Sequence, residues 1–125
     1  MREVLLAADG RSESPAESRF RLLLAEWNLP EPELQLWITT IGGRERVDFG
    51  WPRRRIVIEV HGYGKYFDYL PIDEKVAQQQ AREGRLVAAG WRVLNVYWPE
   101  LDDPVTLGRR VKAFVRTPHA AVELR

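Results

Sequence analysis

Three ionisable side chains near the middle of the sequence fall on two consecutive predicted strands. Asp48 lies inside the strand expected at 44–49, where aspartate is disfavoured. Glu59 and His61 lie in the next expected strand, 55–61, and their two-residue spacing puts both side chains on one face. A charged residue inside an apolar strand indicates either a polar site or a paired charge, because burying a lone charge is costly.

Asp48 and Glu59 have the chemistry of a divalent-metal pair. If their strands pair antiparallel across the turn at 51–53, the two carboxylates converge at one place. Two carboxylates that leave the remaining positions to water and phosphate suit Mg²⁺ or Mn²⁺, and such an ion acidifies an attacking water. The alternative is structural: Asp48 caps a turn and Glu59 pairs with an arginine. The spacing is compatible with both.

Three more residues are candidates for catalysis beside this pair. His61 suits a general base, or a group that orients the attacking water, because imidazole titrates near neutral pH. Lys65 can place a positive charge against a phosphate, or it is a solvated loop lysine. Glu17 is explained by a capping box with Ser14, but it also borders the buried face of its helix and can lean toward the sheet. The candidate catalytic set is therefore Glu17, Asp48, Glu59, His61 and Lys65, with Asp48 and Glu59 as the metal ligands.

Caps, periodicity and turns predict the elements that position these residues. A helix is expected from Ser14 to about Trp27, further helices over 72–89 and from Asp103 to about Val115, and strands over 34–41, 44–49, 55–61 and 91–98. If the last two strands are parallel neighbours, the helix between them is their crossover. We therefore expect an α/β fold with a mixed four-stranded sheet flanked by helices, in the order α-β-β-β-α-β-α. The helix over 72–89 is expected to be half exposed, with a thin apolar face of Val76, Ala77, Leu86 and Val87.

Composition bounds the class of protein. The chain of 125 residues fits one domain, predicted at 14–116, between an extension or linker at 1–13 and a tail at 117–125. It has no cysteine, which excludes a disulfide framework and a thiolate zinc site. With no membrane-length apolar run and no signal-peptide pattern, a cytoplasmic location is expected. The net charge is only +1, but basic residues cluster at 53–55 and 109–116.

Three segments of the chain, SPAESRFRLLL, RVDFGWPRRRIVIEVHGYGKY and AREGRLVAAGWRVLNVYWPEL, together resemble a known family. This is the Vsr-like (very short patch repair) branch of the PD-(D/E)XK restriction-endonuclease-like superfamily, with its small uncharacterised bacterial endonuclease-domain members. The resemblance covers most of the chain from Ser14 to Leu101. It implies that Asp48 is the motif aspartate, Glu59 the motif acid and Glu17 a helix glutamate that often joins the site. It also implies a restriction-endonuclease-like core and a DNA endonuclease that uses Mg²⁺ or Mn²⁺, in DNA repair or defence.

His61 is the departure from the family pattern. The wider superfamily usually has lysine at this position, and the small endonuclease-domain branch commonly has aspartate followed by glycine. His61 followed by Gly62 is similar to the mismatch-repair nucleases themselves. Two alternatives stay open: an active nuclease in which histidine assists the attacking water, and an inactivated copy. The inactive copy would be a DNA-binding or interaction module, or the C-terminal domain of a longer protein.

Residues expected to contact nucleic acid lie in a basic turn, an aromatic loop and the helix after it. The loop at 62–71 holds four aromatic residues that can stack on bases or pack against their own domain. Arg82 and Glu83 can brace the site or contact phosphate, while a solvated helix face is the simpler account. The five tryptophans are expected in the core and sheet cover, with Trp51 as the one that can act beside the site. The expected partner is DNA, together with a second copy of the chain, an upstream DNA-binding domain or another protein. The residues expected to contact nucleic acid are Arg53, Arg54, Tyr63, Tyr66 and Arg82.

Overall fold

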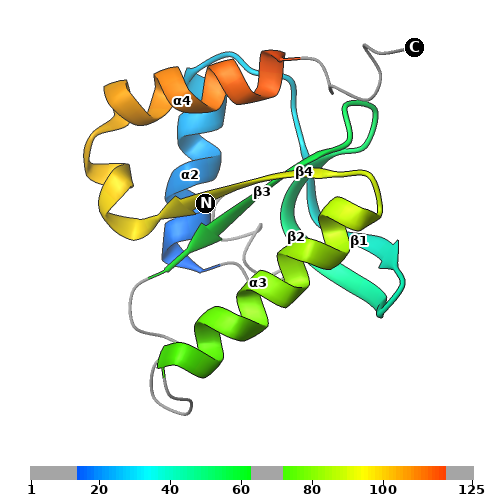
Figure 1. Cartoon of the computed structure of the whole chain (residues 1–125). Helices are drawn as coiled ribbons and strands as arrows, with labels where there is room; N and C mark the ends of the chain where they lie inside the picture. The colour runs from blue at the N-terminus through cyan, green and yellow to red at the C-terminus, as the bar shows by residue number, and fades with distance from the viewer. Residues whose placement is uncertain (1–13, 63–71, 118–125) are drawn as a thin grey trace.

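A computed structural model of the chain describes residues 14–62 and 72–117 (Figure 1). Its elements in chain order are α2 (Pro15–Glu26), β1 (Glu33–Thr40), β2 (Gly43–Trp51), β3 (Ile56–His61), α3 (Ile72–Ala88), β4 (Arg92–Tyr97), the short 3-10 helix η1 (Trp98–Asp102) and α4 (Pro104–Arg116). The predicted α/β class and the order α-β-β-β-α-β-α are confirmed. Within 14–62 and 72–117, no helix is both long enough and apolar enough to cross a membrane.

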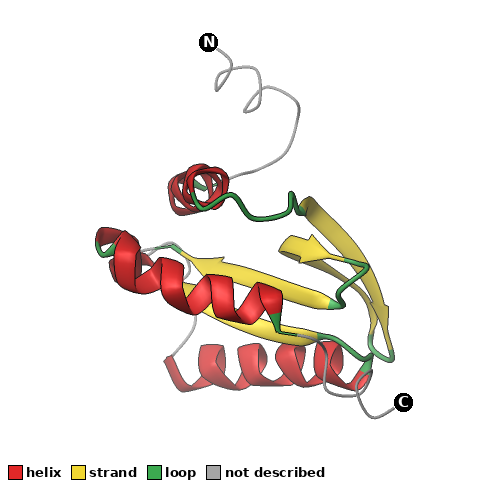
Figure 2. Ribbon diagram, turned by 90° about the horizontal axis from the view of Figure 1, so that it is seen from above, coloured by secondary structure: helices red, strands yellow, loops and turns green. Residues whose placement is uncertain are grey.

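The four strands form one mixed sheet in the order β1-β2-β3-β4. The pairs β1–β2 and β2–β3 are antiparallel, whereas β3 and β4 are parallel, with α3 as their crossover. Helices cover both faces of this sheet, α3 on one and α2 with α4 on the other (Figure 2). The parallel register places Asn95 beside Glu59 and Tyr97 beside His61.

Local sequence signals explain where the elements begin and end. Ser14 caps α2, because its Oγ accepts a backbone N–H of the first turn at 3.1 Å, and Asp103 caps α4 through a similar bond at 3.3 Å. Gly43 has a φ of +112° in the hairpin turn between β1 and β2, a conformation that costs glycine little. The third strand begins at Ile56, one residue later than predicted, because Arg55 has the left-handed φ of +56° in the preceding turn.

Two apolar clusters hold the three layers together. The larger lies between the sheet and the helices α2 and α4, where the rings of Phe20 and Phe49 meet edge to face at 5.3 Å. The smaller lies between the sheet and α3, where Leu86 packs with Val57 and Trp91. Burying an apolar side chain of this size contributes roughly 1.5–3 kcal/mol, so the larger cluster is the main source of stability.

Most of the residues predicted to form the apolar face of α3 are not the ones that it buries. Of these four residues only Leu86 is buried, while Val76, Ala77 and Val87 are exposed. The side of α3 that faces the sheet is largely polar instead, because partners on the strands satisfy its charges. The middle of the helix is exposed at Gln78 and Gln80, as expected.

The tryptophans also divide differently from the prediction. Trp37, expected in the core or sheet cover, is 50% exposed on β1. Trp51 is buried, and its Nε1 donates to the carbonyl of Pro30 at 2.8 Å, so it is a core residue and does not serve as an aromatic platform beside the site.

The strands β1 and β2 both change face at one level of the sheet. In β2, Val47 packs in the cluster under α3 and Phe49 in the cluster under α2 and α4, although residues two apart in a regular strand share a face. Opposite them, Gln35 has a φ of +52° and interrupts the ladder between β1 and β2. The ladder between β2 and β3 ends at the pair Phe49 and Ile58. Asp48 therefore lies where the regular sheet stops.

Candidate active site

Asp48 and Glu59 face each other where the pairing of β2 and β3 ends. The backbone N–H of Asp48 donates to Glu59 Oε2 at 3.1 Å, and the N–H of Val60 donates to Asp48 Oδ2 at 2.9 Å. Glu59 is only 7% exposed. Each carboxylate thus takes a backbone donor of the opposite strand at the level where ladder bonds stop. The antiparallel pairing on which the predicted convergence depended is confirmed.

Negative charge accumulates around Asp48. Burial, the charge of Glu59 and the charge of Glu17 on α2 raise the pKa of Asp48 to about 8, although the hydrogen bond from the N–H of Val60 acts in the opposite direction. Glu17 also shares a hydrogen bond with Asp48, and its Oε1 accepts one from Gln35 Nε2 at 3.3 Å. Three carboxylates from α2, β2 and β3 therefore meet, and this arrangement favours a bound proton or cation.

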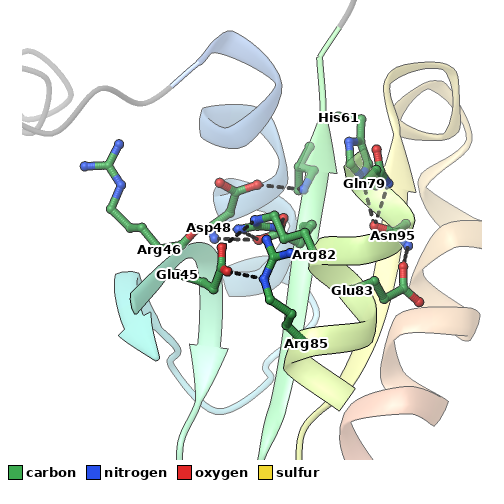
Figure 3. A network of polar contacts seen from close by, with 11 residues as sticks. Glu45, Arg46, Asp48, His61, Gln79, Arg82, Glu83, Arg85 and Asn95 are labelled. Atoms are coloured by element: carbon green, nitrogen blue, oxygen red, sulfur yellow. Dashed lines mark hydrogen bonds and ion pairs between the residues drawn. The ribbon is translucent and has the colours of Figure 1, made fainter. Parts of the chain in front are cut away.

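Arg82 of α3 balances part of this charge (Figure 3). Its Nη1 forms an ion pair with Glu59 Oε1, and its Nη2 donates to the backbone carbonyl of Arg46. Burial acts to lower the pKa of Arg82, but the charges of Glu59 and Glu45 raise it overall, so the guanidinium stays charged. Arg85, one turn later, pairs with Glu45 at 2.6 Å. Two arginines of α3 thus hold β2, and Arg82 braces the site instead of ending in solvent.

The ion pair bears on the two interpretations of Glu59. In the structural alternative, Glu59 pairs with an arginine and Asp48 caps a turn. Glu59 does pair with Arg82. Asp48, however, lies inside β2, and its carboxylate accepts from β3, so it caps no turn. The structure therefore agrees with the structural alternative for Glu59 and disagrees with it for Asp48.

His61 ends β3 in a second polar network, on the face that Glu59 also occupies (Figure 3). Its Nε2 lies 2.8 Å from Asn95 Oδ1, and Asn95 Nδ2 donates to Glu83 Oε1 at 3.0 Å. Because an ionised carboxylate only accepts, Asn95 turns its nitrogen to Glu83 and its oxygen to His61. The short contact with Asn95 Oδ1 assigns a proton to His61 Nε2. Gln79 Nε2 lies 3.2 Å from that nitrogen and 3.4 Å from Asn95 Oδ1, and with a proton on His61 Nε2 it donates to the oxygen.

Stacking fixes the ring plane of His61. The ring of Tyr97 on β4 lies 4.8 Å from it, at an interplanar angle of 19°. Arg110 of α4 donates to the backbone carbonyl of Asn95 at 3.2 Å and so helps to hold this part of β4. With its plane and its Nε2 both held, a neutral His61 presents Nδ1 as its basic atom.

The donor set around Asp48 suits a hard divalent cation. Carboxylate oxygens are the ligands that Mg²⁺ and Mn²⁺ prefer, and the raised pKa of Asp48 reflects burial and neighbouring negative charge that such a cation would offset. Among residues 14–62 and 72–117, no group of three or more His, Cys, Asp or Glu is arranged to hold a metal ion. Asp48 and Glu59 are the residues that would hold such an ion, with water and phosphate in the other positions, and Arg82 would share or release Glu59.

Only part of the predicted set meets at this place. The residues that come together are Glu17, Asp48, Glu59 and Arg82. His61 lies on β3, two residues after Glu59. The predicted nucleic-acid contacts Arg53 and Arg54 lie in the turn before β3, at the opposite end of that strand from His61, and Arg54 Nη1 donates to the carbonyl of Val115 at 3.1 Å. The remaining predicted residues, Lys65, Tyr63 and Tyr66, lie outside the described residues.

Several residues of the site were not predicted from the sequence. Asn95 had a signal, because it is a polar residue inside the bulky strand WRVLNVYW, and the same argument singled out Glu59. Gln79 had none, since it belongs to a run of three glutamines that suggests a solvated helix. Gln35 and Glu45 also had none, because their roles depend on which side chains of α2 and α3 reach them.

Comparisons with known proteins find relatives without a described function. Two uncharacterised proteins, from two strains of Mycobacterium tuberculosis, are each 35% identical to this chain over 112 residues, or 88% of the chain. The chain spans 40% of the length of each relative. No family model and no solved structure matches the chain.

Proposed function

We propose that the protein is a metal-dependent DNA endonuclease that hydrolyses phosphodiester bonds. The observation that carries this proposal is the convergence of Asp48, Glu59 and Glu17, with the pKa of Asp48 raised to about 8 by burial and by the other two charges. A carboxyl group whose pKa is raised by burial and by neighbouring negative charge is a common feature of functional sites. The resemblance of RVDFGWPRRRIVIEVHGYGKY to the Vsr-like motifs supports the same chemistry and names DNA as the substrate class.

The chain supplies ligands, a base and a counter-charge for this reaction. A bound Mg²⁺ or Mn²⁺ would acidify a water and neutralise charge on the phosphate. Asp48 and Glu59 would hold the ion, and Glu17 would support Asp48. His61 accepts a proton from the attacking water at Nδ1, while the water oxygen bonds to phosphorus and the P–O bond to the leaving oxygen breaks. The leaving oxygen keeps the bonding electron pair and takes a proton from solvent water. Lys65, four residues after His61 in sequence, is proposed to face the phosphate.

Arg82 has two roles in this proposal. Without substrate it pairs with Glu59 and limits the cost of a buried carboxylate. With a cation held at Glu59, the guanidinium of Arg82 would be free to bind a phosphate oxygen, for which its fork of donors is suited.

A second function is favoured by the same ion pair. Because Arg82 already satisfies Glu59, the chain can keep the fold without turnover and act as a DNA-binding or interaction module. The length of the relatives, of which this chain spans 40%, is compatible with such a module inside a longer protein.

A nicking assay tests the first function. Purified protein with Mg²⁺ or Mn²⁺ should convert supercoiled plasmid to the nicked form, and Asp48→Ala protein should not. Glu31→Ala, which removes an exposed carboxylate outside the site, should cut like the wild type. Equal background from wild-type and Asp48→Ala proteins would contradict the proposal.

Metal and DNA binding separate the two functions. A nuclease should bind Mn²⁺ in a calorimetric titration, and Asp48→Asn should abolish that binding. An inactive module should instead bind DNA in a salt-sensitive manner that neither chelator nor Glu59→Ala changes.

A further inference from the structure

The outer face of the β1–β2 hairpin carries an exposed tryptophan between two arginines. Trp37 is 50% exposed, and the guanidinium carbons of Arg44 and Arg46 lie 4.6 Å and 5.8 Å from its ring centroid. Both arginines are exposed. Among the described residues, neither guanidinium forms an ion pair with a carboxylate, so this surface, here called the Trp37 platform, keeps two uncompensated positive charges.

The platform is not part of the domain's own packing. The opposite face of the hairpin is covered, because Ile38 and Val47 pack in the cluster under α3 and Glu45 pairs with arginines of α3. The hairpin is therefore anchored through one face only, and its other face leaves Trp37 half exposed. Exposed aromatic residues grouped with unpaired charge mark interaction sites more often than scattered apolar residues do.

The strand β2 links the platform directly to the candidate active site. Arg46 is the cross-strand partner of Trp37 and lies two residues before Asp48. The side chain of Arg46 points away from Arg82, while its backbone carbonyl accepts from Arg82 (Figure 3). A strand rises about 3.3 Å per residue, so Arg44 and Arg46 lie about 7 Å apart along β2, and Asp48 follows two residues later, where the strand changes face. This spacing is comparable to the separation of adjacent phosphates along an extended nucleic-acid strand.

We propose that the Trp37 platform binds an unpaired DNA strand, with one base stacked on Trp37 and neighbouring phosphates bound by Arg44 and Arg46. An indole accepts any base on its face, but only if that base is free of its duplex partner. An arginine that lies over an aromatic ring keeps its N–H donors for phosphate, so the contacts with Trp37 order the two guanidinium groups without consuming them. The inference rests on the proposed nuclease in one respect, since a DNA strand bound at the platform would extend along β2 toward Asp48. The binding itself needs no metal.

Fluorescence anisotropy of a labelled oligothymidine, with chelator present, tests the platform apart from cleavage. Trp37→Ala should weaken binding roughly 5- to 100-fold, and Trp37→Phe should retain most of it. Arg44→Gln/Arg46→Gln should weaken binding and reduce the slope of log affinity against log salt by about 1.4, as expected for two single-strand phosphate contacts. The matched control, Arg109→Gln/Arg116→Gln on α4, makes the same change in net charge and should leave most of the affinity.

Each outcome decides for or against the platform. Equal affinity of wild-type and Trp37→Ala proteins would overturn the inference, and so would equal loss from both arginine pairs, which would indicate only a general charge effect. If Trp37→Ala instead lowers self-association in sedimentation velocity while oligonucleotide affinity stays, the surface is a protein contact and the inference is also wrong. A protein that nicks no plasmid but still binds oligothymidine through Trp37 contradicts the nuclease and upholds the platform. Trp37→Phe and the arginine variants keep the test valid if Trp37→Ala fails to fold.

Discussion

The two faces of β3 bury different kinds of side chain. Toward α2 and α4 the strand presents Ile56, Ile58 and Val60, which join the larger apolar cluster. Toward α3 it presents Val57, then Glu59 and His61, which lie in polar networks. The same six-residue strand thus has one face that stabilises the domain by burial and another that binds polar partners.

The two faces are stabilised in different ways. An apolar face gains free energy from burial itself and needs no partner outside the protein. A buried carboxylate needs a compensating charge, and Arg82 supplies it for Glu59, while burial and the charges of Glu59 and Glu17 raise the pKa of Asp48 to about 8. The polar face is therefore the part of the fold that an added cation would stabilise most.

Truncation of the apolar face should have the largest effect on stability. Phe20→Ala removes a buried ring that contacts Phe49 and should lower the free energy of unfolding by about 4 kcal/mol. Leu22→Ala on the same helix removes an exposed side chain and should change it by less than about 0.5 kcal/mol. Urea unfolding of both variants measures the difference, and similar values would mean that this face is not the stabilising core.

The charge on Asp48 should make the metal-free protein less stable as pH rises. Its folded pKa of about 8 lies above the ordinary value of 3.8, so the folded protein holds a proton that the unfolded chain releases. The stability from this proton is complete below pH 4 and is lost as pH rises through 8. Asp48→Asn should remove the dependence and be more stable than the wild type at pH 8, because it carries no charge to bury.

The difference between wild-type and Asp48→Asn proteins, measured by thermal unfolding from pH 4 to 9, isolates this group from other titrations. Glu31→Gln, which neutralises an exposed carboxylate, should follow the wild-type curve. At pH 8, Mg²⁺ should raise the melting temperature of the wild type and leave that of Asp48→Asn unchanged. Parallel curves for wild-type and Asp48→Asn proteins would show that Asp48 is ionised without cost.

Removing Arg82 should destabilise the polar face less than Phe20→Ala destabilises the apolar one. Arg82→Ala leaves Glu59 buried without its ion-pair partner and should cost about 2 kcal/mol, below the value for a fully buried pair because the Arg82 side chain is 27% exposed. Arg82→Ala/Glu59→Gln should recover part of the loss, since the buried charge is gone. Urea unfolding at pH 7 checks both. A double variant no more stable than Arg82→Ala would indicate that Arg82 acts mainly through Arg46 and Glu45.

The fold could be predicted because its signals are local. Ser14 and Asp103 cap helices, Gly43 permits a hairpin turn, and alternation along β3 separates its apolar and polar faces, all of which short windows of sequence reveal. The convergence of Asp48 and Glu59 needed one further assumption, antiparallel pairing, which the structure confirms. The metal, the DNA substrate and the role of His61 stay predictions.

Residues whose roles depend on distant partners could not be predicted in the same way. The face of α3 was misassigned because Arg82, Glu83 and Gln79 look like solvated residues until β2, β3 and β4 supply partners for them. Trp37 was misassigned because its exposure depends on which face of the hairpin a helix covers, and periodicity along one strand does not contain that information. In both cases the missing information is tertiary packing.

The smallest effect should come from Asn95, and it tests the polar face without touching a carboxylate. Asn95→Ala removes the acceptor at His61 Nε2 and should cost only about 1 kcal/mol of stability. It should, however, change the tautomer of the His61 ring. Wild-type His61 should show the Nε2–H tautomer in ¹⁵N NMR spectra, and the Asn95→Ala protein should show a mixture of both tautomers. His61→Gln assigns the signal against His119. If the tautomer does not change, Asn95 does not orient His61, and the choice of Nδ1 as the basic atom loses its support.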